Sequence, residues 1–143
     1  MNEVAVPKTE RLAVHEENTI HLPLGLLGFE SVKHFVLLAR PDEEPFMRLQ
    51  MLAPGEHAFV VLSPSTILPD YRPELSPEDV AFLELKDPAD ALVVGIVTLY
   101  GNGEATINLR GPIVLNRHTL VGKQVIPLNA GALELRHRLP ACA

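Results

Sequence analysis

Short apolar runs, each bounded by turn residues, recur along the whole chain. The runs are rich in Val, Leu and Ile, and most of them end close to Pro, Gly or Ser. This pattern is typical of short β-strands that pack against one another. We therefore expect strands at 19–22, 33–39, 47–52, 57–62, 92–100, 105–110, 113–115, 123–128 and 133–138.

The clearest local prediction is a hairpin between residues 91 and 110. The run 92–100 contains few polar residues, so both faces of that strand should be covered by other parts of the protein. Asn102-Gly103 favours a tight type I′ turn, because both central residues of such a turn need a positive φ. In the return strand Ala105, Ile107 and Leu109 alternate with polar residues and should share one face. Gly111-Pro112 then removes a backbone donor, so the strand must bend or stop before it resumes at 113.

One helix is predicted at 77–83. Ser76 is a suitable N-cap, Pro77 fits the first helical position, and acidic residues follow in the first turn. Many short strands and this minor helix indicate a mainly β chain, a small antiparallel β-barrel-like or sandwich domain with one or two short helices. Nothing divides the sequence, so we expect one domain over 1–143, with flexible tails at about 1–12 and 139–143.

Composition limits what such a domain can be. Apolar residues make up 47% and aromatic residues only 5%, without Trp, so aliphatic side chains must fill the core. Thirteen Pro and nine Gly disfavour long helices. The formal net charge of −6 argues against direct binding of nucleic acid, which requires clustered Lys and Arg, and suits a protein with a basic partner.

Motifs of catalysis or metal binding are missing from the sequence. The six histidines lack ligand spacing, and a solvated turn explains His15-Glu16-Glu17 better than a metal site does. No nucleophile elbow or phosphate-binding loop occurs. The sequence therefore predicts a protein that is not an enzyme and that holds no metal or cofactor.

The compartment is predicted from three negative features. Cys142 is the single cysteine and cannot form an internal disulfide. The first twenty residues lack the apolar core of a signal peptide, and the apolar run 91–100 is too short to cross a bilayer. We expect a cytoplasmic protein with no membrane association.

Most of the net charge lies in residues 70–90, which we term the acidic segment. It holds seven Asp or Glu residues against Arg72 and Lys86. Two interpretations remain open: a solvated loop and helix face, or a surface that steers a basic partner and raises the association rate. Residues 42–44 extend this surface or form a separate polar loop.

Polar residues near the bend also allow two interpretations. Asn108, Arg110 and Asn116 either satisfy backbone groups where strands bend, with Arg110 paired to an acid, or they contact a partner. Phe29 is either a core residue under a loop or an exposed interface anchor.

Two motifs stand out in the sequence, Gly25-Leu26-Leu27-Gly28-Phe29-Glu30 near the start and residues 108–116 at the bend. They resemble Gly-Leu-Pro-Gly-Phe-Glu and Asn-Leu-Arg-Ala-Pro-Ile-x-Ile-Asn of the FliW family of flagellar assembly factors. Leu49-Gln50, 58–61, 69–71 and Gln124 fall in the expected order. Leu27 replaces a proline, which relaxes the loop, and Gly111 replaces an alanine, which loosens the bend.

The resemblance implies a cytoplasmic protein that binds flagellin and also binds the RNA-binding regulator CsrA, relieving its repression of flagellin translation. We expect a monomer; a small-ligand-binding β-barrel is the alternative function. We further hypothesise that the acidic segment, docked beside the RNA surface of CsrA, repels phosphate without occupying the RNA site. The residues predicted to bind partners are Phe29, Glu30, Asp70, Tyr71, Glu78, Asp79, Asn108, Arg110 and Asn116.

Overall fold

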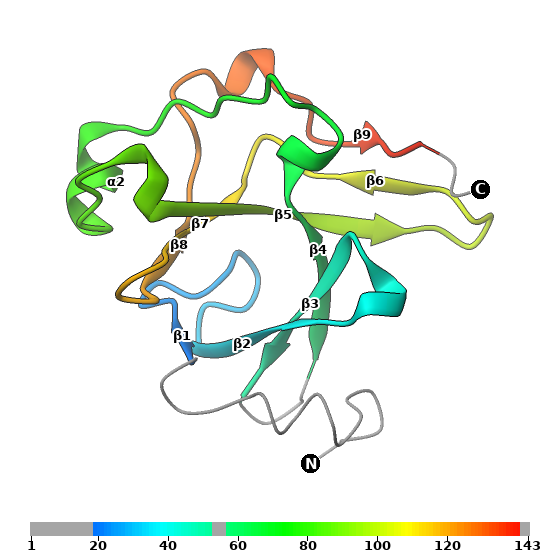
Figure 1. The fold of residues 1–143 in the computed structure, drawn as a ribbon, viewed down its shortest axis with the longest axis horizontal. Coiled ribbons are helices and arrows are strands. Elements are labelled where there is room, and N and C mark those ends of the chain that lie inside the picture. The colour runs from blue at the N-terminus through cyan, green and yellow to red at the C-terminus, as the bar shows by residue number, and fades with distance from the viewer. Residues whose placement is uncertain (1–18, 53–56, 141–143) are drawn as a thin grey trace.

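The computed structural model describes residues 19–52 and 57–140, and its architecture is mainly β (Figure 1). The nine strands in the described residues are β1 (Ile20–His21), β2 (His34–Ala39), β3 (Phe46–Met51), β4 (Ala58–Leu62), β5 (Ala91–Leu99), β6 (Ala105–Ile107), β7 (Ile113–Asn116), β8 (Gly122–Gln124) and β9 (His137–Arg138). One α-helix, α2 (Pro77–Phe82), and four 3-10 turns, η3 (Pro41–Glu43), η4 (Pro64–Thr66), η5 (Pro88–Asp90) and η6 (Ala130–Ala132), lie between them. The predicted class of fold is confirmed.

The strands form one antiparallel sheet that curls into a barrel-like shape (Figure 1). The main order is β1-β2-β3-β4-β5-β6-β9, while β7 pairs with β5 and β8 pairs with β7. A single parallel bridge joins His21 to Val121, which brings β1 beside the chain that enters β8. The β1 end of the sheet therefore meets the β7–β8 branch through this short contact rather than through a full strand pair.

The long strand β5 serves two partners along one edge. Its first half pairs with β7, with Val94 opposite Ile113, and its second half pairs with β6, with Val97 opposite Ile107. The bend predicted at Gly111-Pro112 lies between these two pairings, in residues 108–112, which belong to no strand. The chain leaves the sheet at the bend and returns to it, so the same strand edge is used twice.

The turn that joins β5 to β6 differs from the predicted type I′ turn. Gly103 has φ +88°, whereas Asn102 is not among the described residues with positive φ. The Gly103 N–H donates to the Tyr100 carbonyl, and the Tyr100 N–H donates to the Glu104 carbonyl. This is a three-residue loop in which only Gly103 needs the left-handed conformation. Gly101 supplied the extra loop residue that the prediction left out.

The core of the barrel is filled by aliphatic side chains and one phenylalanine. The largest cluster of buried residues comprises Ile20, Leu22, Leu26, Phe35, Leu49, Met51, Val61, Val94, Ile113 and Leu115. A second cluster under the hairpin comprises Leu62, Val97, Ile107 and Leu109. A ligand-binding barrel would need an enclosed cavity in place of the first cluster, so this interior does not favour the ligand-binding alternative.

The predicted helix is present and begins as expected. The Ser76 hydroxyl accepts a hydrogen bond from the Asp79 N–H, and Pro77 occupies the first turn. The last two predicted strands are shorter than expected. β8 ends at Gln124, after which the Val125 N–H donates to Pro112 O and Pro127 has no N–H to offer.

The ends of the chain were predicted to be tails. At the C-terminal end, Leu139 is attached, because its N–H donates to the Ala105 carbonyl and its side chain packs against the second cluster. Residues 1–12, His15-Glu16-Glu17 and Cys142 lie outside the described residues. The predictions made for them stay predictions.

Candidate protein-binding site

Three segments that are distant in the sequence line one groove on the surface. The groove has a volume of about 350 Å³. Its walls come from the loop after β1, from the bend between β6 and β7, and from the chain around and after β8. We term it the signature groove; it is lined by Leu24, Gly25, Leu27, Glu30, Asn108, Arg110, Gly111, Gln124, Ile126 and Leu135.

The loop after β1 owes its shape to glycine and to one carboxylate. Gly25 has φ +69°, and a Cβ placed there would lie 2.6 Å from the Glu30 Cα, so no other residue fits without a shift. The Glu30 carboxylate accepts a hydrogen bond of 3.1 Å from the Gly28 N–H. This bond holds the pKa of Glu30 below its ordinary value, so Glu30 is ionised at neutral pH.

Phe29 lies at the edge of this loop, between the two predicted environments. The residue is 36% exposed, and its ring packs edge-on against Phe59 with 5.2 Å between the ring centroids. The ring therefore anchors the loop on the sheet while one side stays accessible.

The bend is held by the side chain of Asn108. Its Oδ1 accepts hydrogen bonds from the Arg110 N–H at 2.9 Å and from the Gly111 N–H at 3.0 Å. Arg110 was expected to pair with an acid, but its Nε donates to the Ala130 and Leu133 carbonyls, at 3.1 Å in each case. Both residues thus serve backbone groups, which the structural interpretation predicted for Asn108 but not for Arg110.

Gln124 joins the bend to the loop after β1. Its Nε2 donates to the Gly111 carbonyl at 3.1 Å, and its Oε1 accepts the Leu27 N–H at 3.0 Å. A proline at position 27 would have no N–H to donate, so this second contact depends on the leucine found here. The relaxed loop expected from Leu27 is instead tied to β8.

The rim of the signature groove is apolar and exposed. The exposed fractions are 84% for Leu27, 69% for Ile126, 53% for Leu24 and 49% for Leu135. Isolated exposed leucines are ordinary, but four around one groove form a patch of the kind that marks a protein-binding surface. Sequence reasoning missed these four residues, because each belonged to a loop or a predicted strand with no mark of exposure.

Tyr71 links the acidic segment to the bend. Its hydroxyl donates to the Leu109 carbonyl at 2.7 Å, and burial raises the pKa of Tyr71 to about 12. The ring packs against the second core cluster. Tyr71 therefore has a structural role that the sequence did not indicate, while its neighbour Asp70 is exposed.

The acidic segment divides into exposed and internal carboxylates. Five of its seven acids are exposed: Asp70, Glu74, Glu78, Glu84 and Asp87. Asp79 is only 6% exposed and forms an ion pair with Lys123. Direct contact of Asp79 with a partner, as predicted, is not supported by this geometry; Glu78 beside it is accessible.

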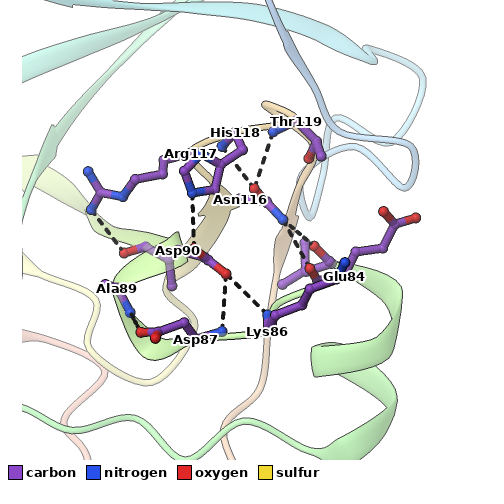
Figure 2. Close-up of polar contacts among 11 residues, drawn as sticks. Glu84, Lys86, Asp87, Ala89, Asp90, Asn116, Arg117, His118 and Thr119 are labelled. Atoms are coloured by element: carbon purple, nitrogen blue, oxygen red, sulfur yellow. Dashed lines mark hydrogen bonds and ion pairs between the residues drawn. The ribbon is translucent and has the colours of Figure 1, made fainter.

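Asn116 is likewise internal, with 3% of its surface exposed. Its Nδ2 donates to the Leu83 carbonyl at 2.9 Å and to the Glu84 carbonyl at 3.3 Å (Figure 2). Its Oδ1 accepts the N–H groups of His118 and Thr119 at 2.8 and 3.2 Å. Asn116 fastens the turn after β7 to the end of α2, so its predicted direct contact with a partner is not supported either.

Asp90 fastens the other end of the same segment (Figure 2). Its carboxylate accepts the Lys86 and Asp87 N–H groups and lies 2.9 Å from the His118 Nε2. The hydrogen bond from Lys86 is the main cause that lowers the pKa of Asp90. Arg117 donates to the Ala91 carbonyl at 3.3 Å. The shape of the acidic segment is therefore fixed against the β7–β8 turn.

The described part of the chain offers little support for a metal site of three or more protein ligands or for a membrane-spanning helix. No group of three or more His, Cys, Asp or Glu residues there is placed to hold a metal ion. No helix among residues 19–52 and 57–140 is long and apolar enough to cross a membrane. An open cleft of about 510 Å³ beside the acidic segment is lined mainly by apolar residues, with Arg72, Lys86 and Asp87 as its charged members.

Comparison with known proteins places this geometry in a family. A family model described as FliW protein matches residues 4–139. The flagellar assembly factor FliW of Bacillus pumilus is 38% identical over 127 residues, covering 88% of each chain. That of Natranaerobius thermophilus is 32% identical, covering 86% of this chain and 83% of the other. A crystal structure of the flagellar assembly factor FliW superposes with a TM-score of 0.78 at 32% identity, covering 91% of both chains.

Proposed function

This chain belongs to the FliW family, and we propose that it serves flagellar assembly by binding proteins rather than by catalysis. One partner is flagellin, which the signature groove receives. The other is the translational regulator CsrA, which the acidic segment receives. Binding of the first partner releases the second, so the level of flagellin controls its own translation.

The observation that carries the proposal is the convergence of three motif segments on one groove with an apolar rim. Leu27, which departs from the motif but lies within its first segment, is 84% exposed at the rim of this groove. Exposed aliphatic side chains cost little in the free protein and contribute on association, when they leave water. The polar motif residues Asn108 and Gln124 hold the three segments in place.

The assignment of CsrA to the acidic segment rests on charge. An RNA-binding protein presents Lys and Arg, and five exposed carboxylates of this segment offer the opposite sign. Such a surface accelerates the encounter more than it tightens the final complex. It also places negative charge beside bound RNA, which disfavours the approach of phosphate.

Titration calorimetry with flagellin from the same organism tests the first half of the proposal. We expect saturable binding that Leu27→Asp weakens by about tenfold or more, since the change introduces a charge into an apolar contact. Leu99→Asp is the matched control, because Leu99 is 64% exposed but lies at the end of β5 in the hairpin. Equal loss in both variants, or no binding by the folded wild-type protein, contradicts the proposal.

Stopped-flow association with CsrA tests the second half. Glu78→Gln combined with Glu84→Gln should slow association several-fold at low salt, and the difference should shrink as salt screens the charges. Glu44→Gln combined with Glu104→Gln removes the same charge outside the acidic segment and is the control. An association rate that is the same in both double variants removes the acidic segment from the interface.

A further inference from the structure

We propose that His21 and His34 together bind one divalent late transition-metal ion such as Zn²⁺. Both side chains are exposed, and ions of this class favour imidazole nitrogen as a ligand. Neither histidine lines the signature groove or belongs to the acidic segment, so the site is separate from the two proposed partner surfaces.

The backbone places the two imidazoles where side chains approach each other closely. His21 and His34 are Cα partners in the antiparallel β1–β2 pair. The next pair along is hydrogen-bonded, since the Leu22 N–H donates to the Lys33 carbonyl at 2.8 Å. Hydrogen-bonded and non-hydrogen-bonded pairs alternate, so the histidines occupy a non-hydrogen-bonded pair, whose Cα atoms lie only about 4.5 Å apart. Their rings are accordingly stacked, with 5.0 Å between the centroids and 10° between the planes.

Neighbouring chains fix the main chain of both histidines. The His21 N–H donates to the Leu120 carbonyl at 2.9 Å, and the His34 carbonyl accepts the Leu52 N–H at 3.0 Å. The side chains remain free to turn, because exposed side chains change rotamer within nanoseconds. The stacked rings are nearly parallel, so a rotation of each aims one nitrogen at a shared ion, about 2.0–2.1 Å from Zn²⁺.

The two rings are also available as ligands. Among the described residues, no hydrogen bond or ion pair engages the side chain of His21 or His34. By contrast, His118 and His137 each have a ring nitrogen in contact with a carboxylate. The net charge of −6 favours the approach of a cation. The pair therefore offers two nitrogen ligands on one ion, and water completes the coordination.

A bound ion would cross-link a strand pair that is short. The strand β1 has two residues, and the loop that follows it forms one wall of the signature groove. One imidazole alone binds weakly, but the second then binds intramolecularly, which raises the affinity of the pair. An ion that binds the folded chain and not the unfolded chain also raises stability. Metal binding and resistance to heat should therefore rise together.

Calorimetric titration of Zn²⁺ into the full chain tests the site, with Cys142→Ser in every sample so that the thiol does not bind the ion. We expect one ion per chain and a melting temperature that rises with zinc. His21→Ala and His34→Ala should each weaken binding at least about tenfold and remove most of that rise, because the second ligand is lost. His57→Ala is the matched control, an exposed histidine whose ring lies 6.2 Å from that of Phe29, and should bind as the parent chain does.

The double variant separates one shared ion from two independent ones. With a shared ion, the chain that carries both His21→Ala and His34→Ala should bind only slightly more weakly than either single variant, because the first substitution already removes the chelate. Two ions on the parent chain with additive losses would overturn the inference, and so would unchanged affinity in the double variant. If alanine disturbs the fold, as circular dichroism without zinc would show, His21→Gln and His34→Gln keep a polar side chain on each strand and give the same readout.

Discussion

Replacing Asn116 by alanine should separate a structural asparagine from a partner-binding one. The side chain is 3% exposed and makes four hydrogen bonds, to two carbonyls at the end of α2 and to two N–H groups of the β7–β8 turn. The alanine variant leaves all four backbone groups without that partner (Figure 2). Its effect should therefore fall on the free energy of unfolding.

The magnitude follows from which of the four groups can reach water. Leu83 is only 1% exposed, so its carbonyl stays unsatisfied, at a cost of about 1–3 kcal/mol. Glu84, His118 and Thr119 are exposed residues, and each of their lost bonds costs about 0.5 kcal/mol, because water replaces the side chain. The total is about 3 kcal/mol, which lowers the melting temperature of a domain of this size by roughly 6–12 °C.

Urea denaturation followed by circular dichroism measures this loss, with Asn102→Ala as the matched control. Asn102 lies in the exposed hairpin loop, and its Oδ1 accepts a hydrogen bond of 3.0 Å from the Glu104 N–H. The control should lose less than about 1 kcal/mol. Equal losses in the two variants would refute the hydrogen-bond argument. Binding of either partner by the folded Asn116→Ala variant, measured well below its melting temperature, should match the wild type.

Three further predictions concern the loop, the segment and the groove. Gly25→Ala should lower the free energy of unfolding by more than about 2 kcal/mol, because the new Cβ would lie 2.6 Å from the Glu30 Cα and the alanine would have to keep φ +69°. An unchanged free energy of unfolding in a denaturation series would contradict this close approach. Since the folded pKa of Asp90 is lowered from 3.8, its contribution is present above that pH and is lost as pH falls through the folded pKa. In the Asp90→Asn variant the melting temperature should therefore fall less steeply between about pH 5 and 2 than in the wild type. An unchanged slope of melting temperature against pH would argue against this contribution of Asp90. Gln124→Ala removes two hydrogen bonds, so it should lower the free energy of unfolding by about 1–2 kcal/mol and weaken flagellin binding. A loss of binding without a loss of stability would mean that Gln124 contacts the partner directly.

The sequence predicted well those features of the fold that depend on a few neighbouring residues. The helix at Ser76-Pro77 begins where predicted, because an N-cap and a first-turn proline act within one turn of chain. Ala105, Ile107 and Leu109 were predicted to share an inward face; Ile107 and Leu109 are buried and Ala105 is half-buried. The turn type was wrong, because Asn102-Gly103 is compatible with two-residue and three-residue loops.

The candidate site was harder to predict, because it exists only after distant segments meet. Gln124 contacts Leu27, which lies 97 positions away in the sequence. No local pattern reports that Ile126 stays exposed while Val125 beside it is 1% exposed. Polar residues drew attention in the sequence, yet Asn108 and Asn116 are occupied by backbone groups. Aliphatic side chains, which the sequence assigned to a core, provide the accessible surface.

The two proposed surfaces are physically joined, which bears on how partners exchange. The Asn129 side chain accepts the Glu74 N–H and donates to the Arg72 carbonyl, while the neighbouring Leu128 N–H donates to the Glu74 carbonyl. Tyr71 adds a fourth bond between the acidic segment and the bend. Because these contacts hold the acidic segment and the signature groove in a fixed arrangement, we expect one partner to exclude the other by its bulk or charge. A large internal rearrangement of the protein is not needed for such an exchange. Asn129→Ala should then loosen the segment and lower stability, and leave the competition between flagellin and CsrA intact; a competition that disappears in this variant would instead indicate coupling through the hydrogen bonds themselves.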